Sequence, residues 1–109
     1  MSERDCLFCR IIDGELPAEI VFEDSQLVAF KDIHPKAPVH LLVVPRLHIA
    51  SLEAVEPEHD SLMAHCLRVL PRLAREQGLT TGFRTVINTG PGGGQEIYHL
   101  HIHLMGGFR

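Results

Sequence analysis

The strongest constraint on the fold of this chain is a run of three histidines that alternate with apolar residues near its C-terminal end. The segment Tyr98–Met105 reads YHLHIHLM. In a β-strand, residues two apart share a face, so the three imidazoles would point one way and the apolar side chains the other. A helix would scatter the imidazoles around its axis and leave no apolar stripe. We therefore expect a strand over His99–Met105 with one face that carries His99, His101 and His103.

Four other segments have the composition of strands. Glu19–Glu23 and Leu27–Lys31 are largely apolar, and only three residues separate them, which predicts a β-hairpin. His40–Val44 is a compact apolar run followed by a proline, which is typical of a buried strand. Arg84–Asn88 is expected to form a further strand.

Helical signals occur in two places. Over Pro57–Gln77, apolar residues recur at spacings of three and four, which predicts a long amphipathic helix. Pro57 suits the first helical turn and Gly78 suits the position after the last one. Pro71 lies inside the pattern, so we expect it to kink or perturb the helix. Cys6–Ile12 is expected to be a short helix.

The order of these segments predicts the fold class. Strands joined by hairpins, rather than by parallel crossovers, indicate an α+β fold. We expect an antiparallel five-stranded sheet, a long helix on one of its faces and a short N-terminal helix. The chain has 109 residues and shows neither a repeat nor a linker, so a single domain over residues 1–109 is expected.

Charge and composition argue against several functions. The net charge is −4, and no cationic cluster favours binding to nucleic acid. No apolar run approaches the ~20 residues of a membrane span. The charged segment Met1–Asp5 leads into no signal-peptide core, and three cysteines are poor material for a disulfide framework. We therefore expect a cytoplasmic protein that does not bind membranes.

Three imidazoles on one strand face are compatible with three kinds of site. They can form a solvated polar face, although histidine is an uncommon surface filler. They can bind a metal, because a catalytic zinc commonly takes three protein ligands. They can also support nucleophilic catalysis, because a neutral imidazole can attack an electrophile while its neighbours orient it and offset phosphate charge.

The histidine segment, HLHIHLM, resembles the signature of the histidine triad superfamily of nucleotide hydrolases and transferases, in which histidines and apolar residues alternate in the same way. The resemblance extends through CLFCRIIDGELPAEIVFEDSQLVAFKDIHPKAPVHLLVVPRLHI and RTVINTGPGGGQEIYHLHIHLMGG. The run AFKDIHPKAPVHLLVVP is similar to the Hint branch, which hydrolyses purine nucleoside phosphoramidates. The implied substrates are conjugates of AMP or GMP.

The resemblance implies a two-step mechanism centred on His101. This residue would attack the α-phosphorus and expel the leaving group, and water would then hydrolyse the nucleotidyl-histidine. Such a pathway replaces one difficult displacement by two easier ones. The backbone carbonyl of His99 would orient the nucleophile, His103 would contact the phosphate, and His40 would support the network as a fourth buried histidine. His40 can also be read simply as a satisfied core histidine.

Further residues match positions that bind the nucleotide or assist its cleavage. Glu96 stands where some family members carry serine, and a glutamate can relay a proton or recognise a cationic leaving group; a solvated loop acid is the alternative. Glycines in the loop before it would let backbone amides approach phosphate oxygens. The resemblance implies that the nucleotide contacts Asp32 through the ribose, Asn88, Gly94 and Gln95 through the loop, Phe8, Ile11, Phe30, Ile33 and Leu42 around the base, and His101 and His103.

Cys6 and Cys9 form a C-x-x-C pair. A disulfide is disfavoured in the cytoplasm, and a thioredoxin-like site lacks its βαβ surroundings. Two thiolates and two imidazoles would instead make a closed tetrahedral zinc site. The resemblance to bacterial relatives implies zinc on Cys6, Cys9, His48 and His99, in a structural role, with no cofactor required for the chemistry. The alternative is a free dithiol packed in the short helix.

The resemblance also implies a homodimer, in which the long helices and adjacent strands pair and the two sheets become one. Three rival functions stay open: a dinucleoside polyphosphate hydrolase, a non-catalytic nucleotide-binding regulatory module, and a protein that binds metal directly on the histidine strand. The C-terminal tail, which shapes substrate choice in longer relatives, is short here. We expect Cys66 to lie in the core, and His34, His59 and His65 to be solvated.

Overall fold

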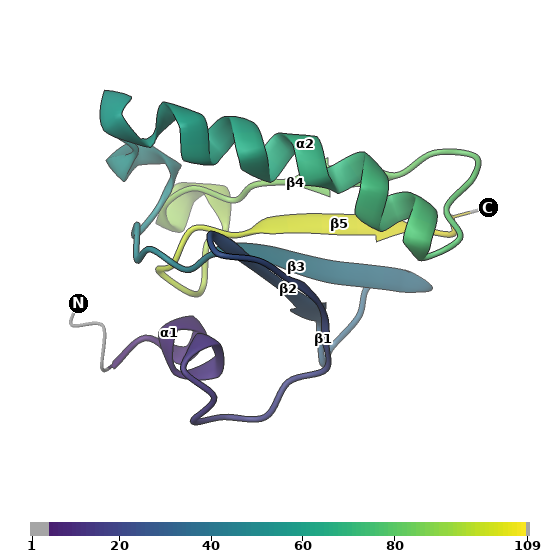
Figure 1. The fold of residues 1–109 in the computed structure, drawn as a ribbon, viewed down its shortest axis with the longest axis horizontal. Helices are drawn as coiled ribbons and strands as arrows, with labels where there is room; N and C mark the ends of the chain where they lie inside the picture. The colour runs from purple at the N-terminus through teal and green to yellow at the C-terminus, as the bar shows by residue number, and fades with distance from the viewer. Residues whose placement is uncertain (1–4, 109) are drawn as a thin grey trace.

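The structure, a computed structural model, describes residues 5–108, so most of the charged N-terminal segment lies outside it. It contains a five-stranded antiparallel sheet with the strand order β1-β2-β3-β5-β4. Helix α2 lies on one face of the sheet and the short helix α1 on the other (Figure 1). The predicted α+β fold is therefore confirmed. The elements are α1 (Leu7–Ile12), β1 (Ile20–Glu23), β2 (Leu27–Lys31), β3 (Val39–Pro45), α2 (Asp60–Glu76), β4 (Arg84–Val86) and β5 (Ile102–Gly106).

The main hydrophobic core lies between the sheet and α2. The apolar residues of the histidine segment, Leu100, Ile102 and Leu104, are buried in it. They pack in one cluster with the apolar stripe of α2, which includes Cys66 and Leu73. The alternation in the sequence thus separates a core face from a histidine face, as expected from the period of a strand.

The regular part of the last strand is shorter than predicted. β5 begins at Ile102, so His99 and His101 precede it. The reason lies in their backbone partners: the amide of Leu100 donates to the carbonyl of Ile49 at 2.7 Å, and the carbonyl of His99 faces the ring of His101 at 2.7 Å. These groups are therefore not available to the ladder with β3, which begins at the pair Val43 and Ile102.

Helix α2 starts later than the sequence pattern suggested. Residues Pro57–His59 form a 3₁₀ turn, and the α-helix begins at Asp60. It then runs as one element through Pro71 to Glu76. Gly78 follows the helix with φ of +80°, the left-handed conformation that glycine adopts without steric strain.

A second, smaller cluster lies on the opposite face of the sheet. Phe8 and Ile11 of α1 pack there against Phe30 of β2 and Leu42 of β3. Phe8 meets Phe30 edge-on, with ring centroids 5.4 Å apart. Because α1 has only six residues, it covers this face incompletely and leaves room for a cavity.

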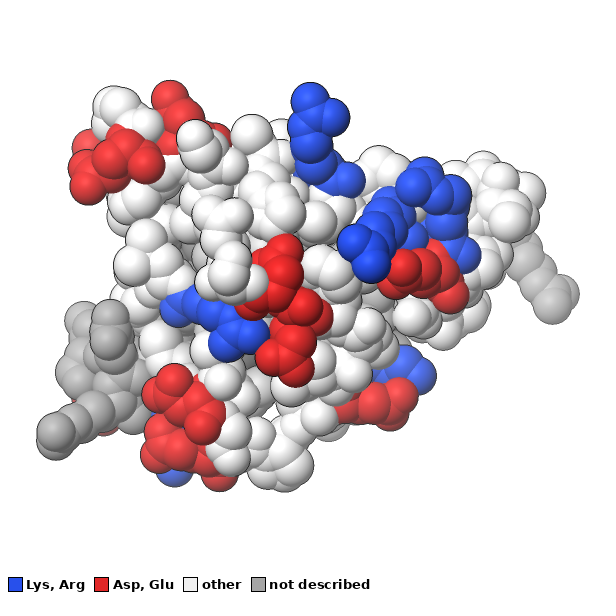
Figure 2. Space-filling view, in the orientation of Figure 1, with Lys and Arg blue, Asp and Glu red and all other residues white. Residues whose placement is uncertain are grey.

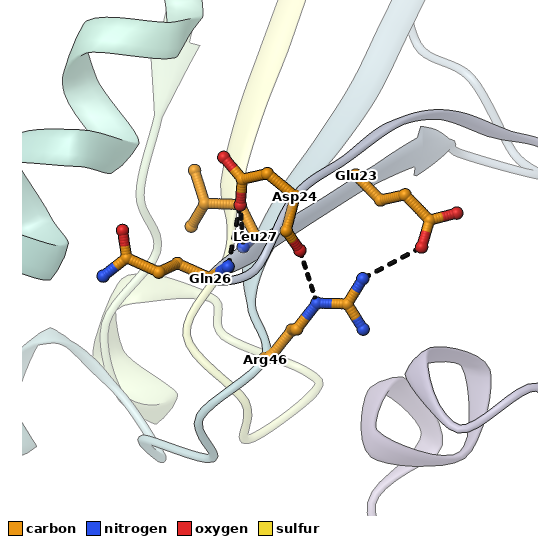
Figure 3. Close-up of polar contacts among 5 residues, drawn as sticks. All are labelled: Glu23, Asp24, Gln26, Leu27 and Arg46. Carbon is orange, nitrogen blue, oxygen red and sulfur yellow. Dashed lines mark hydrogen bonds and ion pairs between the residues drawn. The ribbon is translucent and has the colours of Figure 1, made fainter.

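The turn between β1 and β2 is held by polar contacts (Figure 3). Asp24 Oδ1 accepts hydrogen bonds from the amides of Gln26 at 2.8 Å and Leu27 at 2.7 Å. Arg46, just after β3, donates to the carbonyl of Asp24 at 2.8 Å and pairs with Glu23 at 2.9 Å. These bonds explain why the short loop between the two strands closes as a hairpin, as the sequence predicts.

His65 links this turn to α2, in contrast to the solvated position expected for it. Its Nε2 lies 2.7 Å from Asp24 Oδ2, so it is a paired side chain rather than a solvated one. Burial alone would raise the pKa of Asp24, but hydrogen bonds from His65 and two backbone amides lower it.

On the side of the molecule shown in Figure 2, cationic and anionic side chains are interspersed. Within residues 5–108, no helix combines the length and apolar character needed to cross a bilayer.

Candidate active site and metal centre

The ring of His101 is fixed in one tautomer. Its Nδ1 lies 2.7 Å from the carbonyl oxygen of His99, which can only accept, so Nδ1 carries the proton and Nε2 keeps its lone pair. The ring is buried and packs edge-on against Phe8, with centroids 5.1 Å apart. Burial lowers the pKa of His101, although the hydrogen bond to His99 and the nearby Asp32 oppose the shift. The result is a neutral imidazole with a free nitrogen.

His40 and His103 form a directed chain of hydrogen bonds. The amide of Lys36 donates to His40 Nδ1 at 3.0 Å, so His40 must carry its proton on Nε2. That Nε2–H lies 2.9 Å from His103 Nδ1 and donates to it. His103 therefore presents an N–H on Nε2. Burial lowers the pKa of His103 to about 4, and the neighbouring His101 and His40 add to this effect.

Asp32 lies at the end of this chain, on the loop after β2. Its Oδ1 accepts a hydrogen bond from the amide of His34 at 2.8 Å, and its Oδ2 is 3.5 Å from His40 Nε2. The single proton on His40 Nε2 is directed to the nearer atom, His103 Nδ1. Burial lowers the pKa of His40, so its contact with Asp32 is not an ion pair at neutral pH.

Asp32, His40 and His103 lie close enough together to suggest a metal site. Their protonation does not fit one. The amide of Lys36 occupies the lone pair of His40 Nδ1, so His40 Nε2 would have to lose its proton and become an imidazolate to bind a cation. A hydrogen-bonded relay accounts for this group better than a metal does.

A cavity of about 530 Å³ opens between α1, β2, β3 and the loop before the histidine segment. Its walls include every residue predicted to bind the nucleotide, together with Glu96, whereas His40 and His99 lie behind the wall. Eight further wall residues were not predicted to bind the nucleotide: Leu7, Leu16, Pro17, Ala18, Lys31, His34, Lys36 and Ile97. Most of them are ordinary apolar residues, and no sequence pattern marks them as pocket residues.

Gln95 anchors the glycine loop at one end of the cavity. Its Oε1 accepts a hydrogen bond from the amide of Gly90 at 2.9 Å. Its Nε2 donates to the carbonyls of Ala50 at 2.8 Å and Ile97 at 2.9 Å. The side chain is buried, and these three bonds use its amide fully on the donor side. Gln95 therefore shapes the loop, although it also lines the cavity.

The other loop residues are more open. Asn88 donates from Nδ2 to the carbonyl of Gly93 at 2.8 Å. Gly94 adopts φ of +80°, so the loop requires a left-handed residue at that point. Glu96 is exposed at the cavity wall, and its side chain forms no ion pair with any residue in the part of the chain that the structure describes. The cavity wall thus carries two imidazoles, two carboxylates and the loop. His101, His103 and Asp32 lie near one another, and we call the part of the wall that they form the polar end of the cavity.

The four predicted metal ligands come together behind the histidine segment. The ligand atoms of Cys6, Cys9, His48 and His99 all lie within 4.8 Å of one another. His99 Nδ1 is 3.3 Å from Cys6 Sγ and 3.4 Å from Cys9 Sγ, and His48 Nδ1 is 3.2 Å from Cys9 Sγ. His99 Nε2 donates to the carbonyl of Pro45 at 2.7 Å, so the lone pair of its Nδ1 faces the two sulfurs.

This arrangement fits a tetrahedral zinc ion. Bonds of about 2.0–2.3 Å to a central zinc would place its ligand atoms about 3.3–3.8 Å apart. The sulfur-to-nitrogen distances of 3.2–3.4 Å fall close to this range. Cys6 and His99 are buried, and the hydrogen bond from His99 to Pro45 is the outer support that ligating histidines usually have.

Comparison with known proteins identifies relatives along the whole chain. A family model described as "Scavenger mRNA decapping enzyme C-term binding" matches residues 5–107. Protein HitA of Neisseria gonorrhoeae is 52% identical over 102 residues, which cover 94% of this chain and 95% of HitA. A HIT-like protein of Synechococcus elongatus is 54% identical over 107 residues, covering 98% and 93%. The structure of a HIT family hydrolase from Legionella pneumophila has a TM-score of 0.93 at 48% identity, covering 96% and 95%.

The names of two other relatives mention zinc. The 14 kDa zinc-binding protein of Zea mays is 38% identical over 109 residues, covering 98% of this chain and 85% of the maize protein. A Zn-bound histidine triad family protein of Mycobacterium smegmatis has a TM-score of 0.81 at 34% identity, covering 95% of this chain and 76% of that one.

Proposed function

Because this chain belongs to the histidine triad superfamily, we propose that it is a nucleotide hydrolase of the Hint type, which cleaves purine nucleoside 5′-phosphoramidates to the nucleoside monophosphate and an amine. One observation carries this proposal. A buried, neutral His101 is held by the carbonyl of His99 so that its Nε2 lone pair is free, and the ring lines a cavity large enough for a nucleotide.

In the first step, His101 Nε2 attacks the α-phosphorus. A new N–P bond forms as the bond to the amine breaks, and the product is a nucleotidyl-histidine. The proton on His101 Nδ1 stays on the hydrogen bond to His99, which stabilises the positive charge that develops on the ring. The N–H on His103 Nε2 donates to a non-bridging oxygen of the phosphoryl group.

The amine needs a proton to leave, because an amide anion is a very poor leaving group. We assign this transfer to Glu96, which lies at the cavity wall and is open to solvent, so it can relay a proton from water. General acid catalysis of this kind contributes typically 10²–10⁴-fold. In the second step, water attacks the phosphorus of the intermediate and gives a proton to the Glu96 carboxylate. A new O–P bond forms as the N–P bond breaks, and His101 departs in its original neutral form.

The remaining cavity walls suit a purine nucleoside. Phe8, Ile11, Phe30 and Leu42 provide an apolar slot for the base. Ile33 is 82% exposed, which is unusual for a large apolar side chain and is consistent with covering a bound base. The carboxylate of Asp32 lies on the same wall and can accept hydrogen bonds from the ribose hydroxyls.

We also propose that Cys6, Cys9, His48 and His99 bind a structural zinc ion. Such an ion supplies rigidity, because it ties α1 and the segment after β3 to the residue whose carbonyl orients His101. It takes no part in the phosphoryl chemistry.

A homodimer is the proposed assembly. β4 is a three-residue edge strand, and an exposed edge invites pairing with a second copy. Phe83 beside it and Leu67 on α2 are 41% and 56% exposed, and both would be covered if the strands and long helices paired. Sedimentation should give twice the chain mass of 12.2 kDa, and a monomer at micromolar concentration would contradict this assembly.

Hydrolysis assays test the function. Adenosine 5′-phosphoramidate and a diadenosine polyphosphate are supplied to the wild type and to His101→Ala. We expect AMP release from the phosphoramidate, with a loss of at least about 10³-fold in the variant, since the nucleophile is gone. Rapid quenching and mass spectrometry should detect a nucleotidyl adduct on the wild type alone.

Two results would change the proposal. Preference for the polyphosphate would move the chain to the dinucleoside polyphosphate hydrolases with the same nucleophile. If the folded wild type binds AMP but turns over neither substrate, the protein is a nucleotide-binding module rather than a hydrolase. His34→Ala, which alters an exposed histidine of the cavity mouth, is a matched comparison for a nonspecific loss of imidazole.

A further inference from the structure

The sequence contains two lysines, Lys31 and Lys36, and the structure places them in different electrostatic settings. Both lie at the wall of the cavity. The ammonium of Lys31 is 2.7 Å from Glu19 Oε2, so its charge is already paired. Within residues 5–108, Lys36 forms no ion pair with any Asp or Glu. Lys36 is therefore a cation at the cavity wall whose charge is not neutralised by a carboxylate among the described residues.

Lys36 is also fixed in position by its backbone. Its amide donates to His40 Nδ1 at 3.0 Å, and His40 in turn donates to His103. These hydrogen bonds fix the backbone of Lys36 relative to His40 and His103, so its side chain begins next to the polar end of the cavity. Its charge reaches them: besides burial, which has the largest effect, the Lys36 ammonium lowers the pKa of both His40 and His103.

Among the described residues that line the cavity there is no arginine, and Lys31 is paired with Glu19, so Lys36 is the one lysine of the wall without a carboxylate partner. Asp32 and Glu96 both line the cavity and would repel an anion. His103 offers an N–H, but with a pKa of about 4 it is neutral near pH 7. A phosphoryl oxygen entering the cavity needs a positive charge to offset the two carboxylates, and Lys36 is the group at the wall that can supply it.

We propose that the Lys36 ammonium binds the non-bridging oxygens of the substrate's phosphoryl group, beside the N–H of His103. This inference rests on the proposed function, because it takes a nucleotide to be the ligand. It divides recognition into two parts. The apolar wall binds the base without regard to charge, and Lys36 supplies the part of the affinity that depends on the phosphate.

Calorimetric titrations with AMP and with adenosine separate these parts. In Lys36→Gln we expect the dissociation constant for AMP to rise about five- to tenfold, the effect of one charge-assisted contact at a partly exposed site. Binding of adenosine should change less than about twofold, because the contact is absent from that complex. Lys36→Arg should keep most of the affinity for AMP, since its charge is preserved.

Lys31→Gln is the matched control, because it removes the other lysine of the same wall, whose charge is neutralised by Glu19. AMP binding should change little in this variant. Raising the salt concentration should weaken AMP binding more in the wild type than in Lys36→Gln, because only the wild type has the exposed charge pair to screen.

The outcomes separate this inference from the function on which it rests. A wild type that binds neither AMP nor adenosine overturns the proposed function and the role of Lys36 with it. A wild type that binds AMP, with equal affinity in Lys36→Gln, overturns the role of Lys36 alone. A Lys36→Gln variant that loses adenosine as well as AMP also contradicts it, because Lys36 would then support the cavity rather than the phosphate.

Discussion

At the scale of single residues, Gln95 shows how a buried polar side chain can hold a binding loop. Its amide bonds to Gly90, Ala50 and Ile97, which come from three separate parts of the chain. In Gln95→Ala these partners lose their bonds while still buried or partly buried. We expect the free energy of unfolding to fall by about 1–3 kcal/mol, measured by urea denaturation.

The same substitution should weaken AMP binding, because the loop that lines the cavity loses its anchor. Glu96→Gln is the comparison for stability, since its side chain is exposed and should change the unfolding free energy by less than about 0.5 kcal/mol. If Gln95→Ala is as stable as the wild type and binds AMP equally well, the loop does not depend on Gln95.

The sequence predicted the histidines of the site more fully than their neighbours. Alternation and family resemblance together pointed to His101 and His103, and both line the cavity. The tautomers were not predictable, because they depend on partners distant in sequence, such as the amide of Lys36 for His40. No sequence pattern marked Lys36 as a residue that contacts the ligand. The pairing of His65 with Asp24 was not predictable either, because only the packing of α2 brings these two residues together.

At the scale of elements, the spacing of apolar residues predicted which segments form strands and helices, but it did not predict the residues at which they begin and end. The strand period correctly separated the core face from the histidine face. It did not predict that β5 begins only at Ile102, because the backbone groups of His99 and Leu100 bond outside the ladder. Pro71 was expected to kink or perturb α2, and the helix continues through it to Glu76 without ending there.

The candidate zinc site joins α1 to the rest of the molecule, so it makes a prediction at this scale. Purified protein should contain about one zinc ion per chain by elemental analysis, and Cys6→Ala with Cys9→Ala should contain none. Without the ion α1 loses an anchor. We expect the melting temperature to drop by about 10 °C, which corresponds to roughly 2 kcal/mol for a chain of this size.

Cys66→Ala is the control for metal content, because Cys66 lies on the core-facing side of α2 and is not part of the predicted metal cluster. Burial raises the pKa of Cys66 to about 11, so it stays a neutral thiol and is a poor ligand. Zinc that persists in the double variant at the wild-type level would show that the ion binds elsewhere.

At the scale of the whole molecule, the sheet separates stability from function. The face under α2 holds the larger core, and the face under α1 holds the cavity, the relay and the metal cluster. His99 connects the parts of the second face: its ring faces the cysteines, and its carbonyl orients His101. This division was predictable from the alternation of the histidine segment, because one strand contributes to both faces.

Burying several neutral histidines makes the stability of the molecule depend on pH. Burial lowers the pKa of His40, and it lowers that of His103 to about 4, from the usual 6.5 in the unfolded chain. As the pH falls from 7 toward 4, the unfolded chain takes up protons that the folded chain does not. Stability should therefore be greatest above pH 6.5 and decline steadily below it.

The expected size follows from the same linkage. One unit of pKa shift corresponds to about 1.4 kcal/mol, but His103 is only partly buried and solvent reduces the effect, so we expect it to contribute about 1 kcal/mol between pH 7.5 and 5. Urea denaturation of the wild type and of His103→Gln at both pH values gives the contribution of His103 together with its coupling to His40 and His101. The effects of the more distant histidines and of any zinc cancel in the difference. His34→Gln, at an exposed position, is the control. If His103→Gln loses as much stability on acidification as the wild type does, His103 is not held neutral by the fold, and the N–H donor assigned to it would instead be an imidazolium.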